Sequence, residues 1–523
     1  MAHVFRRRAF HQLLAAPLEL QRMLARQRSK HFICVRGTLA VFSMVFAAPA
    51  LLAEPKPAHA ALAPALVVFA SVAPAVVAPA SIASPPRASA SIASAPVASA
   101  SLGRPTVGDS PGRWPDGTLH LPFENLDGVI LVRAALRGET RDTSGLFVVD
   151  TGAGYLALDG RLADLLGISE TAGATRDVGL AARPLKRLEL GARQMDLVSP
   201  ILTIDAEVIR NVTDREVLGL LGEAQFAGQV LRVDYPGSML TLSHLGPSSA
   251  PRQAKSGSSP VRDRAARSAR ALQGLLNRGA VAVPFRRAGD GKLLVSARVS
   301  GSRGAALSRS LTLVLDTGAT KTVLFRSALD ERSPRHRGWK SICGVSAPTL
   351  FGHAEACIAR VPRLELAGAQ GNLMLHDTDA VILEGPLRKL LSGATGEPIH
   401  GLLGYSFLKH YRVTLDEPNG IAWFECEPED WDGRANEYSH VGIQVERRVG
   451  SVSVVGVLAG SPAAYAGIAV GDEVVRLDGH DAAGMDILDL TRRMEGDPGT
   501  VLSLVIRRGN HEYDHRLVRR RLL

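Results

Sequence analysis

The sequence predicts a mainly β protein in which two copies of one β-rich unit are followed by a smaller α+β domain. The chain has 523 residues, a length that corresponds to about three or four domains. Its hydrophobic content of 46% and charged content of 21% are typical of chains that bury cores, which disfavours a disordered or polytopic membrane protein. Runs of alternating apolar and polar residues, separated by Gly and Pro, predict strands. A long series of such runs occurs twice in the same order and therefore predicts a duplicated unit.

Five motifs define the repeat and follow one another in both copies. They are an apolar segment ending in Pro-Phe (119–123 and 281–285), an alternating strand (129–136 and 293–299), the tetrapeptide Asp-Thr-Gly-Ala (150–153 and 316–319), the tetrapeptide Arg-Leu-Glu-Leu (187–190 and 363–366) and the tetrapeptide Gly-Leu-Leu-Gly (219–222 and 401–404). The offset between matched motifs grows from 162 to 182 residues along the chain. Insertions in the loops between matched strands explain this growth, because loops tolerate changes in length.

Composition divides the chain into six segments. Residues 61–113 are rich in Ala, Pro and Ser and predict an extended tether, because the prolines would break a long helix. Residues 247–278 contain a stretch with the Ser, Arg and Pro composition of a flexible linker between the two copies. The predicted segments are a leader (1–60), the tether (61–113), a first lobe (114–246), the linker (247–278), a second lobe (279–432) and a C-terminal domain (433–523).

The leader has the order of features found in secretory signal peptides. Basic residues up to Arg36 precede the uncharged run 37–53, and the small-residue motif 58–60 follows. This order predicts cleavage after Ala53 or Ala60 and export to the periplasm. The alternative is an uncleaved leader that anchors the protein in the inner membrane, facing the periplasm, because 17 uncharged residues approach the length of a membrane span.

The charge of the chain does not indicate a nucleic-acid partner. Basic residues exceed acidic residues by ten, and residues 1–36 account for seven of these charges. The rest of the chain is nearly balanced and the aromatic content is only 5%, whereas a nucleic-acid-binding surface needs clustered basic and aromatic residues. We therefore expect no nucleic-acid partner, and a membrane tether only through an uncleaved leader.

Three cysteines follow the leader: Cys343, Cys357 and Cys426. They offer no metal cluster, and we predict no metal and no cofactor. Cys343 and Cys357 lie fourteen residues apart around a stretch containing Gly and Pro, a spacing that suits a disulfide across a hairpin in an oxidising compartment. Two buried free thiols are the alternative.

The two Asp-Thr-Gly-Ala motifs supply the candidate catalytic residues, Asp150 and Asp316. One such motif is weak evidence, because Asp and Gly favour any turn after a strand, but two at matched positions make chance a poor explanation. Two neighbouring carboxyl groups cannot both ionise, so one can act as a base on water while the other donates a proton to a carbonyl oxygen. The glycines allow close approach of the backbone, and the threonine hydroxyls can bond between the loops. The expected supporting residues are Thr151, Gly152, Ala153, Thr317, Gly318 and Ala319.

On these motifs, residues 114–246 and 279–432 each resemble a lobe of a retropepsin-like aspartic protease. The second copy matches the family pattern through residues 316–324, and the first has Leu156 where a hydroxyl residue is usual. The resemblance implies two closed β lobes that form a pepsin-like pseudo-dimer in one chain, with the two Asp side chains as its catalytic pair. Ala follows the Gly of both loops where pepsin-like loops have Ser, which implies activity nearer neutral pH. The family also has a flap over the cleft, and residues 339–357 would supply it in the second copy.

The C-terminal domain carries its own series of motifs. They are Val-Gly-Ile-Gln-Val (441–445), Val-Ser-Val-Val-Gly-Val (452–457), Gly-Ser-Pro-Ala-Ala (460–464), Val-Gly-Asp-Glu-Val-Val (470–475), Leu-Asp-Gly (477–479), a short helix near 486–494 and a closing strand (501–509). Together they resemble a PDZ domain of the kind attached to bacterial periplasmic proteases. The resemblance implies that Gly442, Ile443, Gln444 and Val445 form the loop and strand to which a peptide C-terminus adds. The alternative is a domain that packs on the protease without binding peptides.

The whole sequence therefore predicts an exported aspartic endopeptidase that acts on polypeptides, with a PDZ domain that recognises substrates or chain ends. Two alternatives remain open. In one, the protein is a peptide-binding pseudo-protease whose first lobe has lost hydrolysis. In the other, the second lobes of two chains pair, and the resulting homodimer does not use Asp150.

Overall fold

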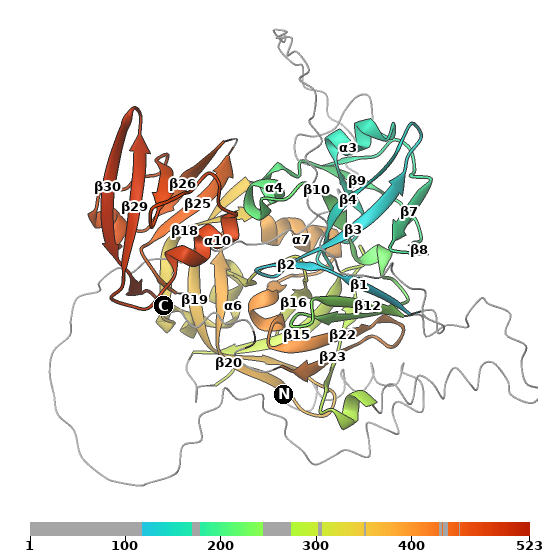
Figure 1. The fold of residues 1–523 in the computed structure, drawn as a ribbon. Coiled ribbons are helices and arrows are strands. Elements are labelled where there is room, and N and C mark those ends of the chain that lie inside the picture. The colour runs from blue at the N-terminus through green and yellow to red at the C-terminus, as the bar shows by residue number, and fades with distance from the viewer. Residues whose placement is uncertain are drawn as a thin grey trace, which may run out of the picture.

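The computed structural model describes residues 118–169, 178–243, 274–301, 306–349, 352–427, 431, 438–448 and 450–523. The structure is mainly β, as the sequence predicts, and its largest sheets hold six to nine strands (Figure 1). The predicted leader, the tether and residues 247–273 of the predicted linker lie outside the described residues. None of the helices in the described part of the chain has the length and hydropathy of a membrane span.

The first lobe is built on a nine-stranded sheet in which the strand order is β6-β9-β5-β10-β4-β3-β7-β8 and β2 pairs with β3. The long strands β3 and β4 form an antiparallel hairpin, and β4 also runs parallel to β10. The strands are β2 (Glu124–Leu126), β3 (Val129–Arg137), β4 (Asp142–Val149), β5 (Ala157–Asp159), β6 (Val178–Leu180), β7 (Arg187–Leu190), β8 (Arg193–Gln194), β9 (Leu202–Ile204) and β10 (Val217–Leu221), and the helices are α3 (Gly160–Leu165) and α4 (Glu207–Thr213).

The second lobe repeats this plan in an eight-stranded sheet with the order β14-β15-β16-β21-β17-β20-β19-β18. Here β15 and β16 are antiparallel, and β16 runs parallel to β21, as β4 does to β10. The strands are β14 (Arg286–Arg287), β15 (Leu293–Ser300), β16 (Leu311–Leu315), β17 (Thr322–Phe325), β18 (Ser341–Thr349), β19 (Gly352–Leu366), β20 (Leu373–Leu383) and β21 (Gly401–Leu403), and the helices are α6 (Arg326–Arg332), α7 (Leu387–Thr395) and α8 (Tyr405–Leu408).

A six-stranded sheet joins the two lobes, and each lobe contributes three of its strands. Its order is β1-β12-β11-β22-β23-β13, so that the antiparallel pair β11 and β22 forms the junction. One continuous apolar core extends across the junction and includes Phe147, Leu231, Leu315 and Phe424. The strands are β1 (Leu119–Pro122), β11 (Val230–Asp234), β12 (Met239–Ser243), β13 (Val281–Pro284), β22 (Tyr411–Asp416) and β23 (Ile421–Cys426).

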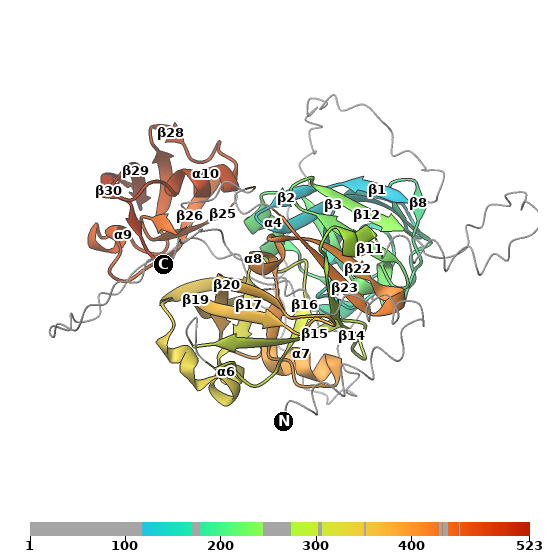
Figure 2. The ribbon, with the colours of Figure 1, turned by 90° about the horizontal axis from the view of Figure 1, so that it is seen from below.

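The C-terminal domain has a sheet of its own, with the order β25-β26-β27-β29-β30 and with β28 on β27. In β26 buried and half-buried residues alternate, as the period of its sequence predicts. Figure 2 shows this domain beside both lobes. Its elements are β24 (Ser439–His440), β25 (Ile443–Arg448), β26 (Ser451–Val457), α9 (Pro462–Tyr465), β27 (Glu473–Leu477), β28 (His480–Asp481), α10 (Ile487–Met494), β29 (Val501–Arg508), β30 (His511–Val518) and β31 (Arg520–Arg521).

The C-terminal domain shares apolar surface with the second lobe. Tyr438, Leu458, Leu522 and Leu523 are buried in the same apolar cluster as residues of β17 to β20. Removal of the domain would expose this cluster to water, at a cost of about 25 cal/mol for each Å² of apolar surface. The domain is therefore part of the folded unit.

A buried histidine makes the stability of the second lobe dependent on pH. The amide of Thr312 donates a hydrogen bond to Nδ1 of His400 (2.9 Å). Burial, together with the positive charges of Arg332 and Arg388, lowers the pKa of His400 to about 4. The unfolded chain takes up this proton near pH 6.5, so acid favours the unfolded state.

We expect the free energy of unfolding to decrease as the pH falls from 6.5 towards 4, because the unfolded chain protonates His400 in this interval and the folded protein does not. Above pH 6.5 this loss of stability should be absent. His400→Asn removes the titrating group, so the difference in stability between the native protein and this variant should shrink over that interval. Urea unfolding at pH 7, 6 and 5 measures the difference. A difference that is constant with pH would contradict the prediction.

Candidate active site

The two Asp-Thr-Gly-Ala loops begin at matched positions in the two lobes. β4 and β16 lead into the loops, and the last three residues of each strand are buried. The amide of Asp150 donates to the carbonyl of Leu221 in β10 (3.0 Å), and the amide of Asp316 donates to the carbonyl of Leu403 in β21 (3.1 Å). The Gly-Leu-Leu-Gly strands therefore hold the start of each loop, because they lie parallel to the strands that carry it.

Each of the two carboxyl groups is bound by its own loop. Oδ1 of Asp150 accepts hydrogen bonds from the amides two and three residues ahead, at 2.8 and 3.0 Å. Oδ1 of Asp316 accepts the matched bonds at 2.9 and 3.1 Å. Oδ2 of each group is buried and accepts no hydrogen bond from the described residues. The donors are Gly152, Ala153, Gly318 and Ala319.

The structure brings the two carboxyl groups together across the junction of the lobes. A Cβ atom placed on Gly152 would lie 2.4 Å from Cγ of Asp316. A Cβ atom on Gly318 would lie 2.6 Å from Cγ of Asp150. Both positions require glycine, because any side chain would collide with the carboxyl group of the opposite loop. Asp150 and Asp316 are themselves fully buried.

Reciprocal hydrogen bonds between two threonines fix the loops to each other. The amide of Thr151 donates to Oγ1 of Thr317, and the amide of Thr317 donates to Oγ1 of Thr151, both at 3.1 Å. Each hydroxyl then donates to the strand that precedes the other loop. Thr151 binds the carbonyl of Leu315 and Thr317 that of Val149, both at 2.9 Å. The loops are thus held by four symmetric bonds within one chain.

The environment raises the pKa of both carboxyl groups. Burial raises the pKa of Asp316 to about 6, although the interaction with Asp150, the loop amides and the positive charge of Lys292 lower it in part. Burial and the negative charge of Asp316 raise the pKa of Asp150 well above its usual range. The pair therefore retains one proton near neutral pH, as two adjacent buried carboxyl groups must.

The first lobe lacks two hydroxyl groups that the second lobe has beside its loop. In the second lobe, Oγ1 of Thr322 accepts from the amide of Gly404 (3.3 Å), and the amide of Thr322 donates to Oγ of Ser406 (2.9 Å). The first lobe has Leu156 and Ala224 at the two matched positions. In the second lobe each of these hydroxyl groups accepts a hydrogen bond from a backbone amide, so the apolar residues of the first lobe remove two acceptors and leave no buried hydroxyl to satisfy.

The predicted peptide-binding residues of the C-terminal domain lie at an edge that the first lobe covers. Ile443, Gln444 and Val445 belong to β25, and Gly442 precedes it with a φ of 91°. β25 is the last strand at one end of its sheet. Its first four residues are nevertheless buried, because two helices lie alongside it. They are α10 of the same domain and α4 of the first lobe (Figures 1 and 2).

Ion pairs and an apolar contact hold the first lobe at this edge. Arg447 of β25 pairs with Asp214, which follows α4, at 3.3 Å. Arg215 pairs with Asp486 at 2.7 Å, and Asp486 is the residue that caps the N-terminus of α10. Leu488 of α10 packs against an apolar cluster of the first lobe. A peptide strand that adds to β25 would therefore have to displace α4.

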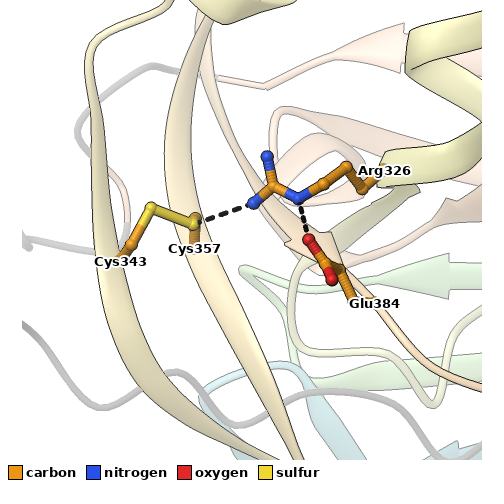
Figure 3. The surroundings of a disulfide bond; sticks show 4 residues. All are labelled: Arg326, Cys343, Cys357 and Glu384. Carbon is orange, nitrogen blue, oxygen red and sulfur yellow. Dashed lines mark hydrogen bonds and ion pairs between the residues drawn. A yellow bond between two sulfur atoms is a disulfide. The ribbon is translucent and has the colours of Figure 1, made fainter.

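Cys343 and Cys357 form a disulfide across the hairpin of β18 and β19 (Figure 3). Nη2 of Arg326 donates to Sγ of Cys357 (3.1 Å), and the same guanidinium pairs with Glu384. The disulfide joins the two strands of the hairpin that was expected to supply a flap. The tip of that hairpin, residues 350–351, lies outside the described residues.

The sequence analysis missed two buried charged side chains near the loops. Glu223 is almost fully buried, its amide donates to the carbonyl of Ala153 (2.7 Å), and its carboxylate pairs with Arg287 (3.2 Å). Burial raises the pKa of Glu223 to about 8. Lys292 is fully buried and pairs with Asp290. A charged residue next to an apolar strand motif was the available signal in both cases.

No group of three or more His, Cys, Asp or Glu side chains in the described residues is arranged to hold a metal ion.

Comparison with known proteins adds two family assignments. Residues 295–407 match the family described as aspartyl protease, and residues 453–508 match the family described as PDZ domain. Among solved structures, the aspartic proteinase from Irpex lacteus has a TM-score of 0.32 and 10% identity and covers 59% of this chain and 97% of its own. The PDZ domain of the carboxy-terminal protease from Vibrio cholerae, solved in complex with a peptide, has a TM-score of 0.15 and 18% identity, covering 16% of this chain and 94% of its own.

Two curated relatives are named as proteases. The carboxy-terminal processing protease CtpA of Bacillus subtilis is 27% identical over 96 residues, which are 18% of this chain and 21% of the relative. A probable CtpA-like serine protease of Staphylococcus epidermidis is 27% identical over 88 residues, or 17% of this chain and 18% of the relative. The chain thus spans about a fifth of the length of these relatives. By its family matches, the chain carries an aspartyl protease domain that includes Asp316, followed by a PDZ domain.

Proposed function

We propose that the protein is an aspartic endopeptidase that hydrolyses polypeptides with the carboxyl pair of Asp150 and Asp316. The observation that carries the proposal is the placement of two buried carboxyl groups on loops that exchange reciprocal hydrogen bonds within one chain. The aspartyl protease match of residues 295–407 supports the same chemistry, because it includes Asp316. One relative is named a probable serine protease, but its similarity covers only 17% of this chain. The carboxyl pair therefore favours an aspartic mechanism over a serine mechanism.

In the proposed reaction, a water molecule attacks the carbonyl carbon of the peptide bond. The ionised carboxylate takes a proton from this water as the new C–O bond forms, and the neutral carboxyl group protonates the carbonyl oxygen as its π bond opens. The resulting diol collapses when the C–N bond breaks. The nitrogen then takes the proton that the first carboxylate had accepted, and a diol hydroxyl returns a proton to the second. One water is consumed, and the pair ends with the single proton with which it began.

Two features favour this enzyme over its alternatives. The four threonine bonds join loops of the same chain, which supports a role for Asp150 without a second copy. The first loop keeps both amide bonds to Oδ1 of Asp150 in spite of Leu156, which supports a competent half-site over a pseudo-protease.

We expect Asp150→Asn and Asp316→Asn each to lower kcat by about a thousandfold or more, because the pair works as one unit. Cleavage of a peptide library, followed by mass spectrometry, measures the loss. Asp416→Asn is the control, since it removes another buried carboxyl group far along the chain in β22 and should leave cleavage in place. Full activity of Asp150→Asn would instead favour the homodimer, and peptide binding without cleavage by the native protein would favour the pseudo-protease.

The same proposal assigns the PDZ domain to recognition of substrates or peptide chain ends at β25. The amides near Gly442 would hold a terminal carboxylate while the peptide pairs with Ile443 to Val445. In the structure α4 lies along this strand, so binding of a peptide competes with the contact between Arg215 and Asp486. The PDZ solved structure in complex with a peptide supports peptide binding by such domains.

We expect peptides with a free C-terminus to bind more tightly than their amidated forms, because amidation removes the charge that the amides hold. Arg215→Ala should tighten the binding of the free peptide several-fold, since it loosens α4 from α10. Calorimetric titration of the full chain measures both effects, and point variants are preferable to deletion because Tyr438 and Leu522 belong to the second-lobe core. Equal affinity for acid and amide peptides would show that the domain is structural.

We also propose that the protein is exported, on the basis of its leader. The order of basic residues, apolar run and small-residue motif supports a cleaved signal and a periplasmic location, with an inner-membrane anchor as the alternative. N-terminal sequencing of the protein from the periplasm should then find Glu54 or Ala61 as the first residue. A protein that keeps its leader would support the anchor.

A further inference from the structure

Each lobe has an Asp-Gly turn just before its first long strand. The turns lie at 127–128, before β3, and at 290–291, before β15, and their glycines have positive φ values of 102° and 96°. The residue after the turn differs, since it is Val129 in the first lobe and Lys292 in the second. The two lobes therefore differ by a full charge at one matched position.

Both turns reach the loop region of the opposite lobe. A Cβ atom on Gly128 would lie 2.4 Å from Cγ of Tyr405, whose amide donates to the carbonyl of Ala319 (2.8 Å). A Cβ atom on Gly154 would lie 2.2 Å from the carbonyl oxygen of Asp290. These contacts place each turn at the junction between the two loops.

The strand register brings Lys292 to the second carboxyl group. β15 and β16 are antiparallel, and Leu294 pairs with Val314. Lys292 immediately precedes β15 and Asp316 immediately follows β16, so the two residues lie at the same end of this antiparallel pair. Continuation of the register past the strand ends would set them opposite each other, with their side chains on the same side of the sheet. The ammonium group therefore belongs to the strand end that carries one of the two candidate catalytic carboxyl groups, and its positive charge acts on that group.

The same construction in the first lobe gives an apolar neighbour. Leu131 of β3 pairs with Val148 of β4. Val129 begins β3 and Asp150 immediately follows β4, so the same register, continued past the end of β4, would set Val129 opposite Asp150. Val129 is fully buried and carries no charge. The two carboxyl groups therefore have the same loop amides around them but different neighbours across the strand.

Lys292 is an unusual side chain for a protein interior. It is fully buried, and its ammonium group pairs with Asp290, which is itself 6% exposed. Lysine is almost never buried in this way unless it is paired, because loss of hydration penalises the charged form. A buried apolar residue such as the matched valine would avoid this cost, so the charge calls for an electrostatic explanation.

We propose that Lys292 is a positioning residue that keeps the negative charge of the pair on Asp316 and the shared proton on Asp150. The inference rests on the proposed function and deepens it, because it assigns a role to each carboxyl group. Asp316 then takes the proton from the attacking water, and Asp150 protonates the carbonyl oxygen. Each bond and proton otherwise follows the balanced reaction given above.

The other ionisable groups around Asp316 are compatible with this assignment. Asp150 faces it from the first loop, and Lys292 with Asp290 faces it from the turn before β15. Burial raises the pKa of Tyr235 well above its usual range, with further contributions from the neighbouring Tyr405 and from the negative charge of Asp316, so this phenol stays neutral. Lys292 is the cation whose charge lowers the pKa of Asp316.

The surroundings of Asp150 favour its neutral form. Burial and the charge of Asp316 raise its pKa. Glu223 lies beside its loop, and burial raises the pKa of this carboxyl to about 8 against the opposing charge of Arg287. The first loop therefore holds its carboxyl group in an environment in which a proton is retained.

The test is the acidic limb of the pH profile of kcat/KM, which reports the first deprotonation of the pair. Lys292→Met keeps the length of the side chain but removes its charge, so the limb should move to higher pH by about one unit. At pH values well below the midpoint of the acidic limb, that shift corresponds to a loss of about tenfold in kcat/KM. The double variant Asp290→Asn/Lys292→Met should shift the limb in the same direction without leaving a buried charge unpaired. Lys292→Arg keeps the charge and should restore the native limb.

Lys321→Met is the matched control. Lys321 is another buried lysine of the second lobe, with 8% exposure, and its ammonium group donates to the hydroxyl of Tyr438 (3.0 Å). Loss of this charge should leave the acidic limb in place. A limb that moves equally in the Lys321 and Lys292 variants, or in neither, would overturn the proposal.

A second readout does not depend on hydrolysis. In protein labelled with ¹³C at the Asp carboxyl carbon, the signal that disappears in Asp316→Asn identifies Asp316. Its titration should move to higher pH in the double variant, while the signal missing in Asp150→Asn should titrate above that of Asp316 in the native protein. The reverse order of the two titrations would overturn the proposal even if no peptide is cleaved. Absence of cleavage with the expected order would instead refute the proposed function alone.

Discussion

The structure depends on holding two carboxyl groups against each other where water is excluded. Such a pair is costly, because burial and mutual repulsion both oppose ionisation. The cost is offset by two amide donors to each Oδ1 and by the reciprocal threonine bonds that prevent the loops from separating. The Gly-Leu-Leu-Gly strands and the six-stranded junction sheet in turn hold the loops in place. Much of the architecture of both lobes thus supports a single contact.

This symmetric frame carries two departures from symmetry, and they differ in kind. The exchange to Leu156 and Ala224 removes two hydroxyl acceptors of backbone amides and adds no charge. The exchange of a valine for Lys292 adds a buried charge at the strand end that carries Asp316. A duplicated unit would give two chemically equal carboxyl groups, whereas the proposed reaction requires a base and an acid. In that reaction, one charged neighbour would be sufficient to distinguish them.

The C-terminal domain is attached at two different kinds of surface. Its apolar contact with the second lobe includes Leu458 and Leu522, and contacts of this kind resemble a core. Its contact with the first lobe relies on Arg215 and Arg447, whose ion pairs are partly exposed and individually weak. The first contact therefore favours a permanent attachment, and the second is the contact that a peptide would replace in the proposed function. The hairpin turn at Asp127 also pairs with Arg492 of α10, so this edge is adjacent to the turn that packs on Tyr405.

The sequence by itself determined what depends on local pattern and on repetition. The mainly β class, the two copies of one unit and the aspartyl protease and PDZ motifs all follow from periodicity and from short motifs whose residues are close in the chain. The sequence also identified Asp150 and Asp316 as the candidate carboxyl pair, because the same loop occurs at the same place in each copy. Only the tertiary structure decided that α4 covers β25, since two separately folded surfaces meet there. Only the pairing of β15 with β16 decided that Lys292 and Asp316 lie at the same strand end, because cross-strand neighbours are set by the pairing of distant segments and not by any spacing along the chain.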